Sequence, residues 1–422
     1  MRKDLMQVRW FESFWRKGES RLPNGPQHLI CLCLFVLFAV PSAMAQETEL
    51  ELQIEPEFRY FFETPSDARQ VDAFGAVAIE ATLETLWEGG AHSFIINPRI
   101  RLDIENPDDE RFDFRSFHYE GIFENFELRL GVDRVFWGVT EFAHFVDVIN
   151  QTDSVESLDG EEKLGQLMLN ITVPSEWGTF DFFILPAFRE RTFEGVSGRP
   201  RLDIPVDVSR PIYEDPEAEK HVDYSARWSH YVGNLDVGLA YFKGTGREPS
   251  FVLDTDENLD PVLRPRYSQI EQGSVDVQMT LDVLLLKFEG LVREELGETS
   301  SMATGGFEYS VYGAFGTSAD IGMIVEYAYD ERGSRSANPY DNDIFAGVRL
   351  GFNDANATSI LGEVGVDLNT QEQILRIEAQ RRLNDNLFLR AELYSFSRAD
   401  AQSPLNSFRD DDFFLIRLAY QF

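Results

Sequence analysis

The sequence predicts an all-β protein: a single transmembrane antiparallel β-barrel of about 18 strands, within a range of 16–18. Three observations carry this prediction. Apolar residues recur at every second position over stretches of about ten residues, which is the period of a strand with two different faces. The connections between these stretches alternate between short and long. Hydrophobic residues make up 43% of the chain, yet the repeated runs of about 20 apolar residues that membrane helices require are missing.

Residues 1–45 are expected to be a cleaved secretory signal peptide, and residues 46–422 the barrel. An apolar run from Leu29 to Val40 follows a basic segment and precedes the small residues 41–45, as in a bacterial export signal with its cleavage site. A short membrane anchor is the alternative. The two cysteines of the chain, Cys31 and Cys33, lie in this segment, so the mature protein is expected to contain no thiol.

Strand periodicity is clearest in residues 94–104, 284–293, 321–329 and 344–352, where apolar positions alternate with Arg, Glu, Asp and Gly. The same reasoning divides the mature chain into eighteen expected strands. Their approximate positions are 50–62, 74–87, 93–104, 113–123, 126–136, 164–173, 178–189, 221–230, 234–243, 268–281, 283–294, 305–316, 320–330, 343–353, 357–368, 373–383, 386–397 and 411–422. An even number of antiparallel strands can close without a free edge, as lipid requires.

The polar face of these strands is expected to line a wet lumen, with the apolar face toward lipid. The candidate lumen charges are Arg99, Arg101, Arg129, Arg189, Arg227, Glu289, Glu326, Arg349, Glu363, Arg376, Arg390 and Arg417. These groups either orient a polar solute and set the ion preference, or form cross-strand pairs that keep the interior electrostatically satisfied. Both interpretations can hold for different residues.

Connections after even-numbered strands are short and are expected on the periplasmic side. Most connections after odd-numbered strands are long and acidic, and they are expected to be extracellular: 137–163, 190–220, 244–267 and 331–342. Residues 254–260 start like a calcium loop but lack its essential glycine, so solvated carboxylates or weak divalent binding are the two interpretations. Divalent cations bound between such acidic loops and anionic lipopolysaccharide would also reduce the electrostatic repulsion between the two.

The segment 137–163 is the most unusual connection. Val139, Phe142, Val146 and Ile149 follow a helical spacing, which predicts a short helix folded into the lumen. The candidate constriction residues are Trp137, Glu141, Phe142, His144, Phe145 and Asp147. The alternative is a loop that only caps the barrel mouth.

Neither an enzyme nor a cofactor is expected. No H-E-x-x-H, G-x-S-x-G or phosphate-binding glycine motif occurs, and the histidines of the mature chain are scattered, so no catalytic or metal site is predicted. A serine hydrolase whose residues meet across strands is the remaining enzymatic alternative. The net charge of −35 argues against a nucleic-acid partner.

Two segments carry a resemblance to known proteins. The last strand has apolar or aromatic residues at Phe414, Ile416, Leu418, Tyr420 and Phe422, and it resembles the C-terminal assembly signature of Gram-negative outer-membrane barrel proteins. In those proteins the barrel-assembly machinery recognises this signature, and the same partner is expected here. Residues 134–140, with Trp-Gly, and 146–150, with Val-Ile-Asn, resemble a strand-to-loop segment of porin-like and exopolysaccharide-export-like barrels.

The resemblance implies a porin-like channel of the bacterial outer membrane for passive diffusion of small polar or ionic solutes, and the acidity adds an expected preference for cations. The protein is also expected to contact outer-membrane lipid and lipopolysaccharide. Whether it forms homo-oligomers is left open. Two alternatives remain. One is a plugged barrel with a structural or cell-surface interaction role, and the other is an exopolysaccharide export barrel with a continuous arginine-lined path.

Overall fold

The computed structural model describes residues 47–106, 109–336, 338–398 and 404–422. The expected signal peptide, 1–45, lies outside these residues. Helical structure in the described ranges consists of short 3-10 turns: η1 (Glu88–Gly90), η3 (Ala218–Lys220), η4 (Ala314–Gly316), η5 (Gly333–Arg335) and η6 (Pro404–Phe408). None of the described helical segments is long and apolar enough to cross a membrane.

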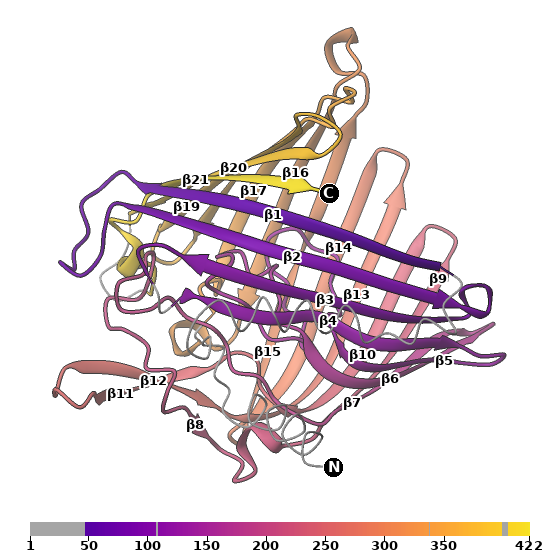
Figure 1. Cartoon of the computed structure of the whole chain (residues 1–422), viewed down its shortest axis with the longest axis horizontal. Helices are drawn as coiled ribbons and strands as arrows, with labels where there is room; N and C mark the ends of the chain where they lie inside the picture. The colour runs from indigo at the N-terminus through magenta and orange to yellow at the C-terminus, as the bar shows by residue number, and fades with distance from the viewer. Residues whose placement is uncertain (1–46, 107–108, 337, 399–403) are drawn as a thin grey trace, which may run out of the picture.

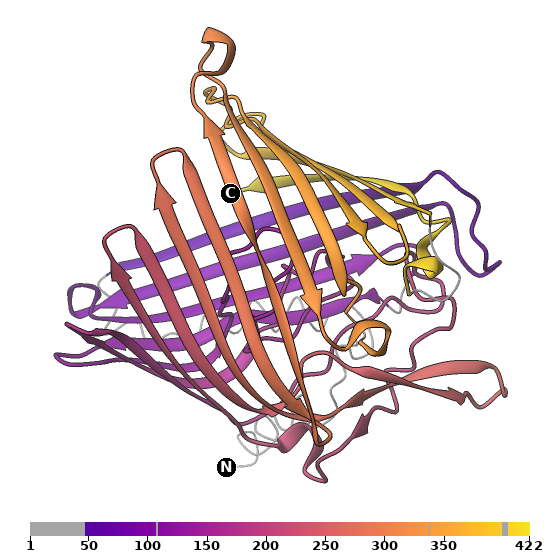
Figure 2. The ribbon, with the colours of Figure 1, turned by 180° about the vertical axis from the view of Figure 1, so that it is seen from behind.

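Eighteen strands form one closed antiparallel barrel (Figure 1). Each strand pairs with the next along the ring, and β21 pairs with β1 to close it. The strands are β1 (Glu47–Phe61), β2 (Ala73–Trp87), β3 (His92–Asp103), β4 (Arg111–Ile122), β5 (Glu127–Asp133), β6 (Gln166–Ser175), β7 (Gly178–Leu185), β9 (Asp223–Val232), β10 (Leu235–Thr245), β13 (Gln269–Leu281), β14 (Leu284–Glu295), β15 (Glu298–Val311), β16 (Asp320–Asp330), β17 (Asn342–Gly351), β18 (Ser359–Asp367), β19 (Gln373–Arg382), β20 (Leu387–Ser397) and β21 (Phe413–Gln421). Figure 2 shows the wall of later strands, in orange and yellow, from behind. The predicted fold class is therefore confirmed.

The two faces of the wall follow the alternation of the sequence. On β1 the side chains of Leu50, Leu52 and Phe58 are exposed on the outside, whereas Glu57 and Arg59 point inward and are buried. The same pattern continues around the ring, which gives the barrel the apolar outer surface that a transmembrane barrel needs.

The C-terminal strand follows the same rule. In β21 the buried residues Phe413, Leu415 and Arg417 alternate with outward-facing Phe414, Ile416 and Leu418. Tyr420 and the terminal Phe422 are exposed. The predicted assembly signature thus lies on the outer face of the strand that closes the barrel.

The two ends of the barrel differ in the length of their connections. Short turns join β2–β3, β4–β5, β6–β7, β9–β10 and β13–β14 at one end, which we call the turn end. The opposite end, the loop end, carries the long segments 62–72, 134–165, 186–222 and 246–268. The β14–β15 connection is also at the loop end but is very short, since Leu296 and Gly297, both at positive φ, turn β14 directly into β15. Two consecutive residues with positive φ match the twist of a tight hairpin.

This turn accounts for the largest error in the strand prediction. A strand was expected at 305–316, but β15 spans Glu298–Val311. Polar residues at its start, such as Thr299 and Ser300, break the apolar alternation, so the sequence pattern alone placed the strand too late.

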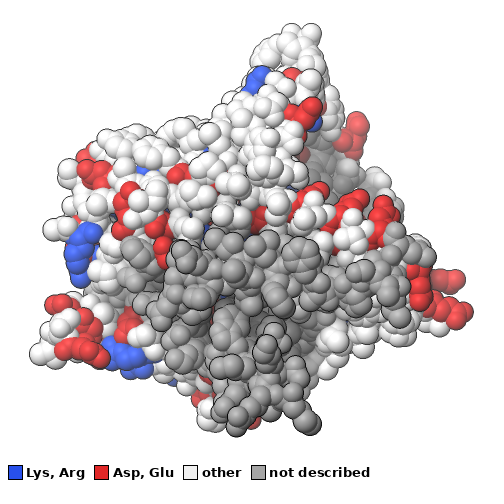
Figure 3. All heavy atoms as spheres, viewed as in Figure 1, with Lys and Arg blue, Asp and Glu red and all other residues white. Residues whose placement is uncertain are grey.

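A second difference is a small sheet at the loop end that was not predicted. The strands β11 (Ser250–Thr255) and β12 (Pro261–Tyr267) form a hairpin that extends away from the barrel wall (Figure 1), and β12 pairs in parallel with β8 (Ile212–Tyr213). The calcium-like residues 254–260 form the hairpin tip, where Asp256 accepts the backbone N–H groups of Asn258 and Asp260 at 2.8 and 2.9 Å. Acidic side chains are more evident than basic ones on the face in Figure 3.

Candidate functional site

The segment 134–165, between β5 and β6, folds back into the barrel, and we call it the inserted segment. The predicted helix is wrong, because this part of the chain consists of bends, turns and extended residues. Val146 and Ile149 are nevertheless fully buried, as a lumen insertion predicts. These two residues are buried because they pack against the barrel wall. The apolar spacing therefore predicted which residues are buried, but not the backbone conformation.

Glu289, an inward-facing and fully buried residue of β14, holds the first bend of the inserted segment. Its Oε1 accepts the backbone N–H groups of Val139 at 2.8 Å and Thr140 at 3.1 Å, and the Thr140 hydroxyl at 2.6 Å. Its Oε2 accepts the N–H of Val146 at 3.3 Å. A carboxylate with several such donors is well satisfied although it is buried.

Gly138 allows this close approach. Its φ is +143°, and a Cβ atom at this position would lie 2.9 Å from Glu289 Oε1. A glycine is therefore needed here both for its backbone conformation and for space.

Glu326 of β16 is the second wall carboxylate that binds the inserted segment. It is buried and accepts the backbone N–H groups of Glu141 at 2.9 Å and Phe142 at 3.1 Å. The Glu141 side chain points elsewhere, to Arg349 at 2.5 Å and Lys287 at 3.5 Å. The last two contacts hold the pKa of Glu141 below its usual range although burial opposes this.

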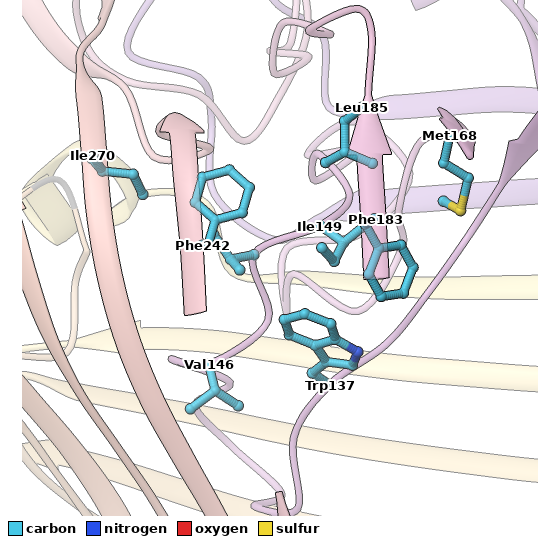
Figure 4. Packing of buried hydrophobic residues seen from close by; sticks show 9 residues of the cluster. Trp137, Val146, Ile149, Met168, Phe183, Leu185, Phe242 and Ile270 are labelled. Atoms are coloured by element: carbon cyan, nitrogen blue, oxygen red, sulfur yellow. The ribbon is translucent and has the colours of Figure 1, made fainter. Parts of the chain in front are cut away.

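Apolar contacts fix the inserted segment on two sides of the lumen. Trp137, Val146 and Ile149 pack against residues of β6, β7, β10 and β13 that turn inward, and Figure 4 shows this cluster: Met168, Phe183, Leu185, Phe242 and Ile270. On the opposite side Phe142 stacks on Phe345 of β17, with ring centroids 5.2 Å apart, and Phe145 packs against the same cluster.

Asn150 joins the two legs of the inserted segment. Its Oδ1 accepts the N–H of Val135 at 2.8 Å, and its Nδ2 donates to the carbonyls of Asp133 and Leu164 at 2.9 and 2.8 Å. Asp147 adds an ion pair with Lys163 at 2.9 Å and accepts the N–H of Trp137 at 3.2 Å. The Trp-Gly and Val-Ile-Asn stretches therefore belong to one structural unit.

The rest of the inserted segment crosses to the seam where β21 meets β1. Glu156 pairs with Arg99, and its carbonyl accepts a hydrogen bond from Arg417 at 2.9 Å. Arg99 and Arg101 hold the pKa of Glu156 at about 2 against the effect of burial. Arg417 also pairs with Glu57 of β1 and Glu392 of β20, each at 2.8 Å.

Every arginine predicted to face the lumen has a carboxylate within 4.0 Å. The partners are Glu55, Glu80 and Glu156 for Arg99, Glu57 for Arg101, Glu120 and Asp133 for Arg129, Asp113 for Arg189, Asp276 for Arg227, Glu141 for Arg349, Asp159 and Glu363 for Arg376, Glu378 for Arg390, and Glu57 and Glu392 for Arg417. Arg99, Arg189, Arg349, Arg376 and Arg417 touch the inserted segment, and Arg227 lies 5.1 Å from the Trp137 ring centre. Arg390 lies apart from that segment.

Two cavities lie on either side of the inserted segment. The turn-side cavity has a volume of about 600 Å³ and is bordered by Phe136, His144, Lys163 and Lys287. The loop-side chamber has a volume of about 220 Å³ and is bordered by the inserted segment, the loop-end segments and the wall. Glu141 and Glu161 line both. The two carboxylates therefore stand at the boundary between the cavities.

Burial and the nearby Asp159 raise the pKa of Glu161 to about 7. Burial also lowers the pKa of His144, which is therefore neutral at pH 7. Glu161 was not among the predicted site residues. Nothing in the local sequence Asp-Gly-Glu-Glu distinguishes it from Glu162, which pairs with Arg115 at 3.0 Å.

One group of carboxylates has the spacing of a metal site. Oxygens of Asp341, Asp343 and Asp367 lie within 4.8 Å of one another at the loop end. An acidic cluster alone does not define a cation site, and we assign no ion to it.

No family model and no curated protein matches the chain. Among solved structures, the chain is similar to mutants of the porin of Rhodopseudomonas blastica. Three of these are each 10% identical to it over 89% of this chain and 100% of their own, with TM-scores of 0.45, 0.44 and 0.44. Similarity at this level carries no argument about function, so the argument below rests on the barrel itself.

Proposed function

We propose that the protein is a porin-like channel of the bacterial outer membrane through which small polar or ionic solutes diffuse passively, with a preference for cations. In this arrangement the turn end faces the periplasm and the loop end faces the outside. The inserted segment is the constriction of the pore.

The observation that carries the proposal is the pair of cavities that share Glu141 and Glu161. A solid plug would have filled this boundary with packed side chains. Instead, the inserted segment leaves space on both of its sides, and carboxylates stand between the two spaces. Because Arg349 and Lys287 neutralise Glu141, the carboxylate that sets the ion preference is Glu161.

The ion pairs favour this proposal over an exopolysaccharide export barrel. A path for an anionic polymer needs arginines whose charge is free to bind it. The nine arginines predicted to face the lumen are instead paired with carboxylates, several of them on neighbouring strands. A pore for small solutes is compatible with such paired charges.

Planar-bilayer recording of the purified full-length protein tests the proposal. Stable conductance steps are expected, with a reversal potential in a salt gradient that shows cation preference. Absence of steps would instead support the plugged-barrel alternative.

The location of the constriction is tested separately with Glu161→Cys. This experiment uses the mature chain, residues 46–422, which contains no native cysteine, so a charged thiol reagent will react only at the introduced residue. Modification is expected to lower the conductance. Glu124→Cys, in the exposed β4–β5 turn, is the matched control and should be insensitive. Unchanged conductance after complete modification at 161 would exclude this position from the pore.

A further inference from the structure

The loop-side chamber has the lining of a ligand site and not that of a simple aqueous passage. Eight of the residues that border it are aromatic, and further apolar side chains such as Leu202 and Ile374 complete the lining. Phe193 and Phe251 meet edge to face within it, with ring centroids 5.6 Å apart. An apolar cavity with a few polar groups is the usual form of a small-molecule site.

Most charged groups of the chamber are already neutralised. Arg376 pairs with Asp159 at 2.8 Å and with Glu363 at 3.7 Å. Arg201 pairs with Asp67 at 2.6 Å. These ion pairs are complete without a ligand.

The three remaining carboxylates that line the chamber are also accounted for. Glu141 is held by Arg349 and Lys287. Glu194 contacts Arg59 at 3.2 Å, and burial together with Asp109 raises its pKa well above the usual range. Glu161 carries a full charge only above pH 7.

Arg191 is the exception. Its Nε donates to Ser154 Oγ at 2.7 Å, and its backbone N–H donates to the Tyr267 hydroxyl at 3.0 Å. Among the described residues, no carboxylate lies within 4.0 Å of its guanidinium group, and its two terminal nitrogens have no hydrogen-bond partner. Because Arg191 borders the chamber, these nitrogens are available to a molecule inside it.

Glu248 attracts Arg191 electrostatically but is itself paired with Arg293 and Arg332. A guanidinium group partly removed from water and without a carboxylate of its own is costly, and an anion that accepts two parallel hydrogen bonds from it removes that cost. We propose that the loop-side chamber binds a single-ring organic carboxylate, with the carboxylate on the terminal nitrogens of Arg191 and the ring among the aromatic side chains. This inference rests on the proposed function in one respect. It names a class of solute that would reach the channel from its loop end.

The size of the chamber sets the class of ligand. An engineered apolar cavity of about 150 Å³ holds benzene, whereas drug-sized ligands occupy roughly 300–1,000 Å³. At about 220 Å³ the chamber accommodates one ring with a small polar group. A sugar or a peptide would leave several hydroxyl or amide groups against aromatic surfaces without partners.

Calorimetric titration of the detergent-solubilised full-length protein with benzoate tests the proposal. Saturable binding is expected, and Arg191→Gln should weaken it by about tenfold or more, because the variant removes the charge-assisted hydrogen bonds to the carboxylate. The neutral probe benzyl alcohol should bind wild type and Arg191→Gln equally. Arg210→Gln, at an exposed arginine outside the chamber, is the matched control and should leave benzoate binding unchanged.

Leu202→Trp provides a second, independent variant, because it fills the chamber and leaves Arg191 in place. It should abolish binding of both probes. Lack of saturable benzoate binding to wild type, or equal benzoate affinity in wild type and Arg191→Gln, would overturn the assignment. If wild type conducts but does not bind benzoate, only this inference fails. Binding without any conductance would contradict the proposed channel and leave the site intact.

Discussion

The carboxylate of Glu289, on the barrel wall, accepts the backbone N–H of Val139 at 2.8 Å, and so joins strand β14 to a segment that enters the barrel between β5 and β6. Glu326 makes the same kind of contact with the next two residues, Glu141 and Phe142. Wall carboxylates thus hold the inserted segment through its backbone, whatever side chains the segment carries. A loop held in this way keeps a fixed shape inside a pore without needing a helix.

This arrangement predicts that Glu289→Gln will release the first bend of the inserted segment. The amide has only one acceptor oxygen, so at least one of the N–H groups of Val139, Thr140 and Val146 will face an NH₂ group. We expect the free energy of unfolding to fall by about 1–3 kcal/mol, and the inserted segment to become sensitive to protease. Gly138→Ala should have the same effect by displacing the carboxylate sterically.

Denaturant titration and limited proteolysis of the purified protein check this prediction. Glu84→Gln is the matched control, because Glu84 lies on the inner face of β2 and has no hydrogen bond to the inserted segment. If the three variants are equally stable and equally resistant, the wall carboxylates do not hold the segment.

The seam of the barrel predicts unequal roles for two neighbouring arginines. Arg417 and Arg390 face each other across β21 and β20, but Arg417 is buried between Glu57 and Glu392, while Arg390 is half exposed and 3.7 Å from its partner. Removing one member of a buried ion pair leaves an uncompensated charge and costs about 3–5 kcal/mol, against at most about 1 kcal/mol at an exposed pair. Arg417→Met should therefore be far less stable than Arg390→Met. Equal unfolding midpoints in denaturant would show that the seam does not depend on Arg417.

Asn150 is predicted to be essential for the fold of the inserted segment. Asn150→Asp keeps the shape of the side chain but removes the two N–H donors to the carbonyls of Asp133 and Leu164. Each buried group left unpaired costs about 1–3 kcal/mol, so a total loss of several kcal/mol is expected. Thermal unfolding followed by circular dichroism measures it. Asn234→Asp, in the exposed β9–β10 turn, is the control that should unfold like wild type.

The wall could be predicted from the sequence because each strand carries its own evidence. Leu50 and Leu52 point outward and Glu57 points inward regardless of what the neighbouring strands contain, so alternation alone locates β1. The start of β15, after the tight turn at Leu296 and Gly297, could not be predicted in this way. It pairs with β14, but its polar residues do not alternate with apolar ones.

The site could be predicted only in part, because its contacts join residues far apart in the chain. The spacing of apolar residues in 137–163 predicted that this segment enters the lumen. Glu289 and Glu326 were correctly expected to point inward, but their hydrogen bonds to that segment have no local signature. Arg191 and Glu161 are distinguished from other charged residues by the partners that they lack, and a sequence does not record missing partners.

The raised pKa of Glu161 predicts an ion preference that depends on pH. Burial and Asp159 raise its pKa to about 7, so the carboxyl gains its charge as the pH rises from about 6 to 8. We expect the cation preference, measured from reversal potentials in a salt gradient, to increase over this range, and Glu161→Gln to remove the increase. Glu124→Gln, in the exposed β4–β5 turn, should retain it.

The same shift affects stability. A carboxyl whose folded pKa lies above its unfolded value binds its proton more tightly in the folded state, so its contribution to stability is present at low pH and is lost as the pH rises through about 7. Glu161→Gln should therefore gain stability relative to wild type between pH 5 and 8. Ion preference and unfolding midpoint should therefore be measured against pH for wild type and Glu161→Gln. If both curves coincide for the two proteins at every pH, Glu161 is not the titrating group.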